Sequence, residues 1–275
     1  MKKLFFISLP LFLLVSINCF AQNNLSNFEN EKGSLDIAGG TAHIPVLKEA
    51  SQNIMKFNPD IRITIGGGGS GTGIKKAGEG LIDIGNSGRK PTENEIEKYN
   101  LSMYKWAIDG VAVVVNTNNP VSDIDTKTLQ RIFSGEITNW KEIGGKDASI
   151  NIYTRDEASG TREVFWKKAL SKGNITQKAV FISSNGAMKT AVSKDDNAIG
   201  YISVGHLDNN VKGVSLNGAY PDLYNVKSGK YPVSRGLFSN TKGEAKGLAK
   251  KFIDYLYSED GQKIIKAKGF IPAER

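Results

Sequence analysis

The sequence contains very few of the side chains that usually carry catalysis or bind metals. Its 275 residues include one cysteine, Cys19, and two histidines, His43 and His206. A secreted phosphoesterase would need a nucleophile beside a base, or a cluster of metal ligands. No spacing of histidine and aspartate suggests a metal pair, and each histidine is more simply a loop or helix-surface residue. We therefore expect a protein that is not an enzyme and that has no cofactor or bound metal.

Long apolar stretches are absent after the first 21 residues. The chain begins with a methionine and two lysines, continues with an apolar segment (4–17), and reaches the small residues Cys19 and Ala21. This order is typical of a signal peptide (1–21) cleaved after Ala21, and the apolar segment is too short to span a bilayer comfortably. Acylation of Cys19 would instead give a lipoprotein, although Asn18 fits poorly before such a cysteine. We expect a mature chain outside the cytoplasm that its core, and not disulfides, holds together.

The charge balance is positive, with 36 lysines and arginines against 28 acidic residues. A positive field favours an anionic ligand, although it is a weak indication. Nucleic acid is a poor candidate partner, because the lysines fall mostly on the outer faces of expected helices and have no aromatic residues interleaved with them.

Predicted strands and helices alternate along almost the whole mature chain. Strands are expected at residues 33–40, 60–65, 81–87, 106–116, 149–153, 179–182, 198–203 and 231–238. The segment 106–116 is the longest β-branched apolar run, which suits a central strand that passes from one lobe into another. The alternation predicts an α/β architecture with mainly parallel sheets. Residues 23–32 are polar, and we expect them to be disordered.

The segment from Arg155 to Thr161 is the most informative one for function. It lies between a predicted strand and a predicted helix, so that Ser159 is placed as the helix N-cap. The N–H groups of Gly160 and Thr161 then have no partner inside the helix, and the helix dipole favours negative charge there. With the hydroxyls and the planar fork of Arg155, the segment resembles a cradle for an oxyanion. The alternative is an ordinary capped helix beside a surface arginine.

Two other segments repeat this design. Thr41 follows Gly39-Gly40 and precedes a helical segment, and Ser70 lies in the glycine-rich run 66–73 between a predicted strand and a predicted helix. Successive glycines let the backbone, here including Gly71, approach a ligand closely. The run also fits the G-x-G-x-x-G spacing of a dinucleotide loop, but export and the recurrence of the pattern argue against that ligand. No Lys-Ser or Lys-Thr follows the glycines, which excludes a nucleoside-triphosphate loop.

Three further polar residues lie close to this design. Ser87 and Arg89 follow a predicted strand, at the carboxyl end where ligands gather in open α/β sheets. Asp109 is an acid inside the apolar strand 106–116, and a buried acid normally has a partner. That partner is either the ligand or a structural salt bridge, for which Arg89 is the candidate.

The three cradles together favour a small anion that is dense in acceptor oxygens. If their strands end on facing edges, their donors converge on one site. Phosphate or sulfate fits such a site, whereas a carboxylate has too few oxygens to use all the donors.

Several motifs resemble those of the periplasmic phosphate-binding proteins that feed phosphate ABC importers. The resemblance runs from Gly33 to the C-terminus and rests on these segments: Gly39-Gly40-Thr41, Gly69-Ser70-Gly71-Thr72-Gly73, Phe133-Ser134-Gly135-Glu136-Ile137-Thr138-Asn139-Trp140, Arg155-x-x-x-Ser159-Gly160-Thr161 and Ala198-Ile199-Gly200-Tyr201. It implies a type II periplasmic binding protein fold, with two α/β lobes that have mainly parallel central sheets and are joined by two hinge crossings. The implied division is lobe 1 at 33–112 and 229–275, and lobe 2 at 113–228.

The resemblance also implies a function and a set of site residues. The function is capture of inorganic phosphate by a periplasmic monomer, which delivers the phosphate to the permease subunits of an ABC transporter. The predicted ligand-binding residues are Thr41, the N–H of Ala42, Ser70, Gly71, Ser87, Arg89, Asp109, Arg155, Ser159, Gly160 and Thr161. Glu157 resembles an acid that steadies the arginine from outside the site.

The sequence departs from the family pattern at one position. Known members have an aspartate in the loop after the third strand, where it accepts the proton of hydrogen phosphate, and this chain has Gly88 there. Either another acid, for which Asp109 is the candidate, performs that role, or selectivity is weaker. In the second case sulfate, molybdate or arsenate is the alternative ligand, because a buried carboxylate repels an anion that brings no hydrogen.

Overall fold

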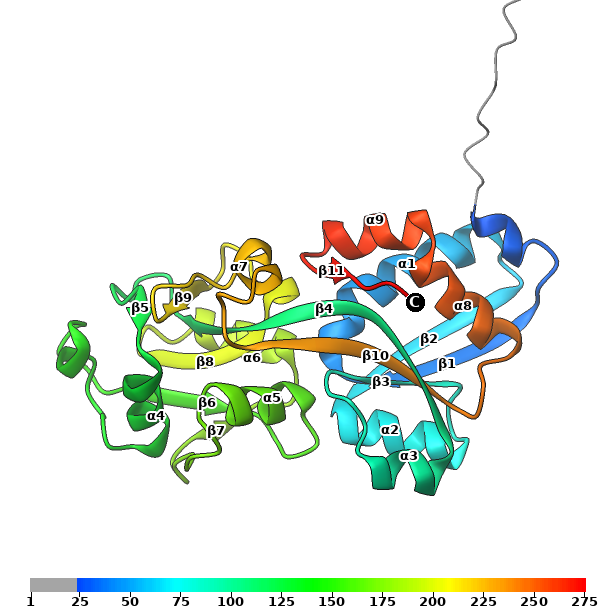
Figure 1. Cartoon of the computed structure of the whole chain (residues 1–275). Helices are drawn as coiled ribbons and strands as arrows, with labels where there is room; N and C mark the ends of the chain where they lie inside the picture. Colours follow the sequence, from blue (N-terminus) through cyan, green and yellow to red (C-terminus); the bar gives the residue numbers. More distant parts are fainter. Residues whose placement is uncertain (1–23) are drawn as a thin grey trace, which may run out of the picture.

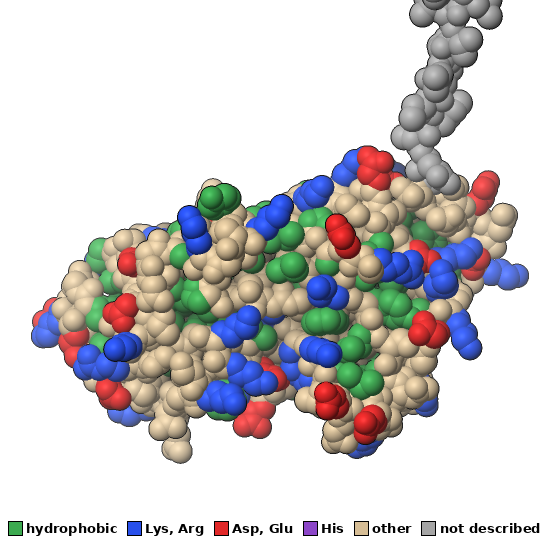
Figure 2. Space-filling view, viewed as in Figure 1, with side chains coloured by type: hydrophobic (Ala, Val, Ile, Leu, Met, Phe, Trp, Pro, Cys, Tyr) green, Lys and Arg blue, Asp and Glu red, His purple; other side chains and the backbone are tan. Residues whose placement is uncertain are grey.

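The computed structural model describes residues 24–275 (Figure 1). The expected signal peptide and Cys19 lie outside the described residues. In the described part of the chain, no helix is long and apolar enough to cross a membrane. Figure 2 shows lysine and arginine side chains spread among acidic ones over the visible face, and not gathered into one basic patch.

A first group of elements combines the beginning and the end of the chain (Figure 1). It contains η1 (Asn24–Phe28), β1 (Gly33–Gly39), η2 (Thr41–His43), α1 (Ile44–Phe57), β2 (Ile61–Gly68), α2 (Gly69–Glu79), β3 (Ile84–Ser87), α3 (Glu93–Tyr99), α8 (Gly247–Tyr257) and α9 (Glu259–Ala267). Helix α1 buries Val46, Leu47 and Ile54 completely, because apolar residues at three- and four-residue spacings share one helix face. These side chains join those of Leu35 and Phe252 in one hydrophobic core.

A second group of elements contains the middle of the chain and has its own core. Its members are β5 (Asp123–Ile124), α4 (Thr126–Ser134), η3 (Trp140–Ile143), β6 (Asn151–Thr154), α5 (Gly160–Lys168), β7 (Val180–Phe181), α6 (Asn185–Ser193), β8 (Ala198–Ser203), η4 (Val204–His206), β9 (Lys212–Leu216) and α7 (Leu223–Lys227). Phe133, Phe165 and Tyr201 are fully buried in this core. Ser159 accepts a hydrogen bond from the N–H of Arg162 and is the N-cap of α5, as predicted.

Two long strands connect the groups: β4 (Leu101–Val115) and β10 (Ser234–Lys242) run from one group to the other (Figure 1). The strand order is β2-β1-β3-β10-β4-β8-β6-β7, and the short β11 (Ile271–Pro272) pairs with β4. Every antiparallel pair of named strands contains β4 or β10, and the other pairs are parallel. The fold is therefore a mixed α/β structure, in which parallel pairing is limited to the parts on either side of these strands.

Some local predictions were wrong for identifiable reasons. The segment expected to be disordered begins with η1, where the ring of Phe28 is 1% exposed. The amide Nδ2 of Asn58 donates hydrogen bonds of 2.7 Å to the carbonyls of Phe28 and Glu31. One buried aromatic ring and one buried amide thus fix a segment whose composition is polar. Helix α2 begins at Gly69, inside the glycine run that was expected to be a loop.

Candidate functional site

The three predicted cradles meet at one small, tightly lined cavity. Its lining comprises Gly40, Thr41, Ala42, Gly69, Ser70 and Gly88 from the first group, Arg155, Ser159, Gly160 and Thr161 from the second, and Arg235 from β10. The cavity therefore lies where the two groups of elements meet.

Helix beginnings supply backbone donors to this cavity. Gly160 opens α5, Gly69 opens α2, and Thr41 opens η2, which continues into α1. The first N–H groups of a helix have no partner within it, and the positive end of the helix dipole lies there. The cavity therefore offers several N–H donors in a positive field, which suits an anion.

The hydroxyls act differently from the prediction, because only Ser159 is a helix cap. Ser70 is the second residue of α2, and its Oγ accepts a hydrogen bond of 2.9 Å from the N–H of Gly88. The Oγ1 of Thr41 accepts from the backbone N–H (3.2 Å) and Nδ2 (3.0 Å) of Asn185. Each of these two hydroxyls accepts from a neighbouring nitrogen, which leaves its own proton free for a ligand.

Arg155 is 1% exposed, and its guanidinium is only partly paired. Its Nη2 donates to the carbonyl of Ser183 (3.0 Å), whereas Nε and Nη1 have no hydrogen-bond partner. Burial lowers the pKa of Arg155, but arginine stays charged in proteins. Within residues 24–275 Arg155 makes no ion pair, so Glu157 does not steady it in the way that the resemblance implied. Buried donors without partners indicate that an acceptor belongs in this space.

Arg235 is a cavity residue that the sequence analysis did not identify. Its Nε and Nη2 lie 2.9 Å and 2.7 Å from Oδ2 of Asp109, and its Nη1 donates to Oγ1 of Thr161 (2.9 Å). Its signal in the sequence was a charged residue inside a predicted strand, the same signal that drew attention to Asp109. The pairing depends on the register in which β10 lies against β4, where Arg235 faces Asp109 directly.

The guanidinium of Arg235 also occupies the space beside Gly88. A Cβ atom added to Gly88 would lie 2.7 Å from Nη1 of Arg235. An acid at position 88 therefore has no room unless Arg235 moves. No carboxylate replaces it, because none of the described lining residues is acidic.

Four of the predicted site residues lie outside the cavity lining. Gly71 donates its N–H to the carbonyl of Ala158 (3.0 Å), and the Oγ of Ser87 accepts from Nδ2 of Asn240 (2.9 Å). The other two, Arg89 and Asp109, are held in ion pairs.

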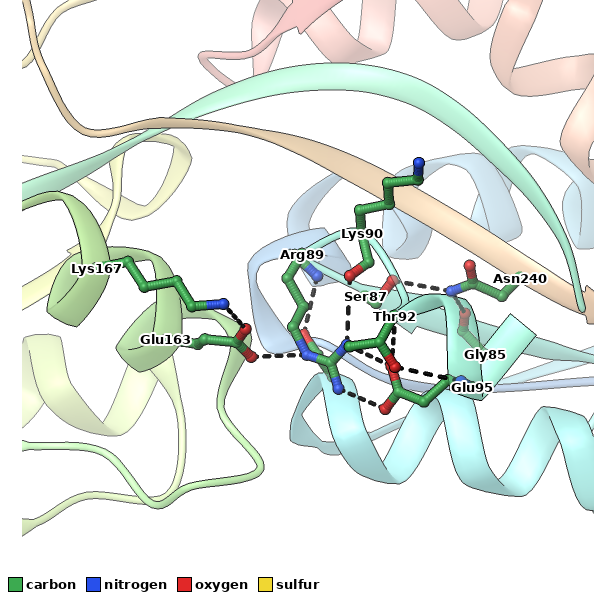
Figure 3. Close-up of polar contacts among 11 residues, drawn as sticks. Gly85, Ser87, Arg89, Lys90, Thr92, Glu95, Glu163, Lys167 and Asn240 are labelled. Carbon is green, nitrogen blue, oxygen red and sulfur yellow. Dashed lines mark hydrogen bonds and ion pairs between the residues drawn. The ribbon is translucent and has the colours of Figure 1, made fainter. Parts of the chain in front are cut away.

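Arg89 binds acids from both groups of elements (Figure 3). It contacts both carboxylate oxygens of Glu95 at 2.7 Å and Oε2 of Glu163, on α5, at 2.8 Å. The proposed salt bridge between Arg89 and Asp109 was wrong, since the partner of Asp109 is Arg235. Burial raises the pKa of Asp109, while Arg235 and a hydrogen bond from Ser203 oppose that effect. Every partner donates to Asp109, as expected for an ionised carboxylate.

One of the two histidines is buried, contrary to expectation, and the other is partly buried. His43 is fully buried, with its ring nitrogens 2.9 Å from the carbonyl of Gly40 and 3.2 Å from that of Ser87. Nε2 of His206 donates to the carbonyl of Thr41 (3.1 Å) across the junction of the two groups. Neither ring lines the cavity.

Comparisons with known proteins identify the family of the chain. The family model of the PBP superfamily domain matches residues 27–260. The phosphate-binding protein PstS of Bacillus subtilis is 38% identical over 98% of this chain and 94% of its own length. That of Borreliella burgdorferi is 32% identical over 90% of this chain and 92% of its own length.

Solved structures with at least 30% identity are similar as well. A substrate-binding protein of Clostridium perfringens, solved with bound phosphate, has a TM-score of 0.82 and 34% identity, covering 88% of this chain and 100% of that one. An ABC-type phosphate transport receptor of Vibrio cholerae has a TM-score of 0.69 and 32% identity, covering 86% and 99%. The chain therefore belongs to the PBP superfamily and, within it, to the family of PstS phosphate-binding proteins.

Proposed function

We propose that this protein captures inorganic phosphate in the cavity and delivers it to the membrane subunits of an ABC importer. The observation that carries the proposal is Arg155, a buried cation with two unpartnered donors at a cavity that helix beginnings and hydroxyls surround. A tetrahedral anion has enough oxygens to accept from all of these donors at once.

The charges of the site favour a small dianion. The described lining contains two arginines. Asp109 neutralises Arg235, whereas Arg155 has no ion-pair partner. The N–H groups at the beginnings of α5 and α2 add partial positive charge. In a space closed to water these interactions are stronger than in solution, because the local dielectric constant is low.

We further propose that the two groups of elements are the lobes of a type II periplasmic binding protein and close around the ligand. The strands β4 and β10 serve as the hinge crossings, and the lobes comprise residues 33–112 with 229–275, and 113–228. The contacts between Arg89 and Glu163, and between His206 and Thr41, join the lobes and belong to a closed form. Phosphate enters when these contacts open, and residues 1–21 direct the protein, as a monomer, to the periplasm.

The site is not that of a phosphoesterase. Hydrolysis would need a base beside one of the hydroxyls, or a metal. The described lining residues include neither histidine nor carboxylate, and no group of three or more potential metal ligands occurs among residues 24–275. Hydroxyls without a base can bind a phosphate oxygen but are not activated to attack phosphorus.

Arg155→Ala tests the proposed site by titration calorimetry with phosphate. Charge-assisted hydrogen bonds contribute about 1.5–3 kcal/mol each, so losing two should weaken binding by about 100-fold or more. The control is Arg131→Ala, which makes the same charge change in the same group but at an exposed side chain (57%). Unchanged affinity in Arg155→Ala would remove that residue from the site, and turnover of a chromogenic phosphate ester by the wild type would contradict the transport function.

A further inference from the structure

We infer that Asn185 is a positioning residue that fixes Thr41 as a hydrogen-bond donor to the ligand, and that it does so only when the lobes are closed. The inference rests on the proposed function, because it concerns how the same cavity recognises phosphate. Asn185 is fully buried and opens α6, but it does not line the cavity. It therefore acts through Thr41.

The contact with Asn185 occupies both lone pairs of the Thr41 hydroxyl. The backbone N–H and the Nδ2 of Asn185 both donate to Oγ1 of Thr41, at 3.2 Å and 3.0 Å. A hydroxyl has one proton and two lone pairs, so both lone pairs of Thr41 are used. Its proton is then free for the cavity that Thr41 lines, and Thr41 has no lone pair left to accept the proton of a phosphate.

The side chain of Asn185 is itself held in one orientation. Its Oδ1 accepts a hydrogen bond from the backbone N–H of Ser203 (2.9 Å), which leaves Nδ2 directed at Thr41. The Oγ of Ser203 donates to Oδ1 of Asp109 (3.0 Å), and Asp109 in turn pairs with Arg235. A continuous polar chain behind the wall thus links the two cavity residues Thr41 and Arg235.

This series of hydrogen bonds joins the two lobes. It can therefore form only when the lobes are closed. Thr41 belongs to the first group of elements, whereas Asn185 lies on α6 in the second (Figure 1). Movement of the lobes apart would separate the two residues and leave the Thr41 hydroxyl free to rotate. Closure of the lobes therefore also fixes the Thr41 hydroxyl as a donor to the cavity.

The consequence is a preference for the form of phosphate that carries fewer protons. The hydroxyl of Thr41 donates more strongly to an ionised oxygen than to the oxygen of a P–OH group, and it cannot accept the proton of that group, so the dianion should bind more tightly than the monoanion. Asn185→Asp reverses this polarity. A carboxylate oxygen keeps the bond from Ser203 but accepts from the Thr41 hydroxyl, so that Thr41 turns a lone pair to the cavity.

Phosphate affinity measured at about pH 6 and about pH 8 tests the inference, because the second ionisation of phosphate lies in this range. The readout is the ratio of the two dissociation constants. Asn185→Asp should change this ratio by about 10-fold in favour of binding at about pH 6, relative to Asn209→Asp. Asn209→Asp is the control, because it makes the same charge change at an exposed residue of the same group. Asn185→Ala frees one lone pair of Thr41 without adding charge and should shift the ratio by about 3- to 5-fold in the same direction.

The outcomes separate positioning from structural damage. Damage to the fold would weaken binding at both pH values and leave the ratio at that of the Asn209→Asp control, which would overturn the inference. A shift in Asn185→Asp without one in Asn185→Ala would assign the effect to added charge and would also overturn it. If Asn185→Asp does not fold, Asn185→Ala decides by the same ratio. Failure of the wild type and the Asn209→Asp control to bind phosphate would instead refute the proposed function and the inference with it.

Discussion

The two histidines, one buried and one partly buried, predict how the stability of the protein depends on pH. Burial, with the nearby charge of Arg235, lowers the pKa of His43 from 6.5 to about 3. Burial also lowers the pKa of His206 to about 4, helped by the positive charges of Lys189, Arg235 and Arg155. Both rings are therefore neutral in the folded protein at every pH above about 5.

The direction of the effect follows from the lowered values. The unfolded chain takes up protons on its histidines below pH 6.5, whereas the folded chain does not. The stabilisation is complete above that pH and is lost as the pH falls from 6.5 to about 4 for His206 and to about 3 for His43. At about pH 5 the 1.5-unit difference amounts to about 2 kcal/mol for each ring, or about 4 kcal/mol for both.

Nuclear magnetic resonance tests this directly, because the chain has two histidines and hence two pairs of imidazole signals. In the phosphate-bound protein, the signals of neither ring should show the change in chemical shift that accompanies protonation between about pH 8 and about pH 5. The charge of bound phosphate would oppose that of the nearby arginines, but burial is the largest cause of both shifts. Titration of either ring near 6.5 would refute the reasoning for that ring.

A stability measurement gives the magnitude. The free energy of unfolding in urea should fall by about 4 kcal/mol between about pH 7 and about pH 5, beyond the change that the carboxylates produce. His206→Gln keeps a side-chain N–H donor but cannot be protonated, so its loss should be smaller by about 2 kcal/mol. Equal losses in the two proteins would show that His206 is accessible to protons in the folded state.

Two more predictions concern the charges around the cavity. Asp109→Asn leaves the buried Arg235 without its counter-ion and should destabilise the unliganded protein by about 3–5 kcal/mol. Phosphate should then raise the melting temperature of this variant more than that of the wild type. An equal rise in the two proteins would mean that Arg235 does not respond to the anion. Sulfate should displace phosphate at about pH 8 with an affinity within about 100-fold, because the described lining lacks the carboxylate that would repel it by about 4 kcal/mol per unit charge at 4 Å. Competition calorimetry measures this, with arsenate as the positive control, and no displacement by about 1000-fold excess sulfate would indicate an acceptor inside the cavity.

Local patterns in the sequence were enough to predict one wall of the site. Ser159 and Arg155 lie within five residues of each other at a junction of strand and helix, where cap, dipole and donors all follow from the local order of residues. Strand β8 was also predicted with its observed bounds, because its apolar run is short and has clear ends. Such features need no knowledge of the tertiary structure.

The glycine run shows where local reasoning failed. Residues 69–73 were placed before the predicted helix, as a run that approaches a ligand, yet α2 begins at Gly69 although glycine disfavours helices. A Cβ atom on Gly73 would lie 2.5 Å from the carbonyl oxygen of Asn86, on the neighbouring strand β3. The glycine is therefore needed for the close approach of helix and strand, and this tertiary contact outweighs its low helix propensity.

The selectivity of the site could not be predicted for a related reason. A sequence shows which hydroxyls are present, but not which of their lone pairs are already occupied. For Thr41 that depends on Asn185, which lies 144 residues away in the chain and in the other group of elements. For Arg235 it depends on β10 meeting β4 in the register that sets it against Asp109. We thus propose that the cavity surface determines that an anion binds, whereas the residues behind it, through the protons they leave available, determine which ionic form is preferred.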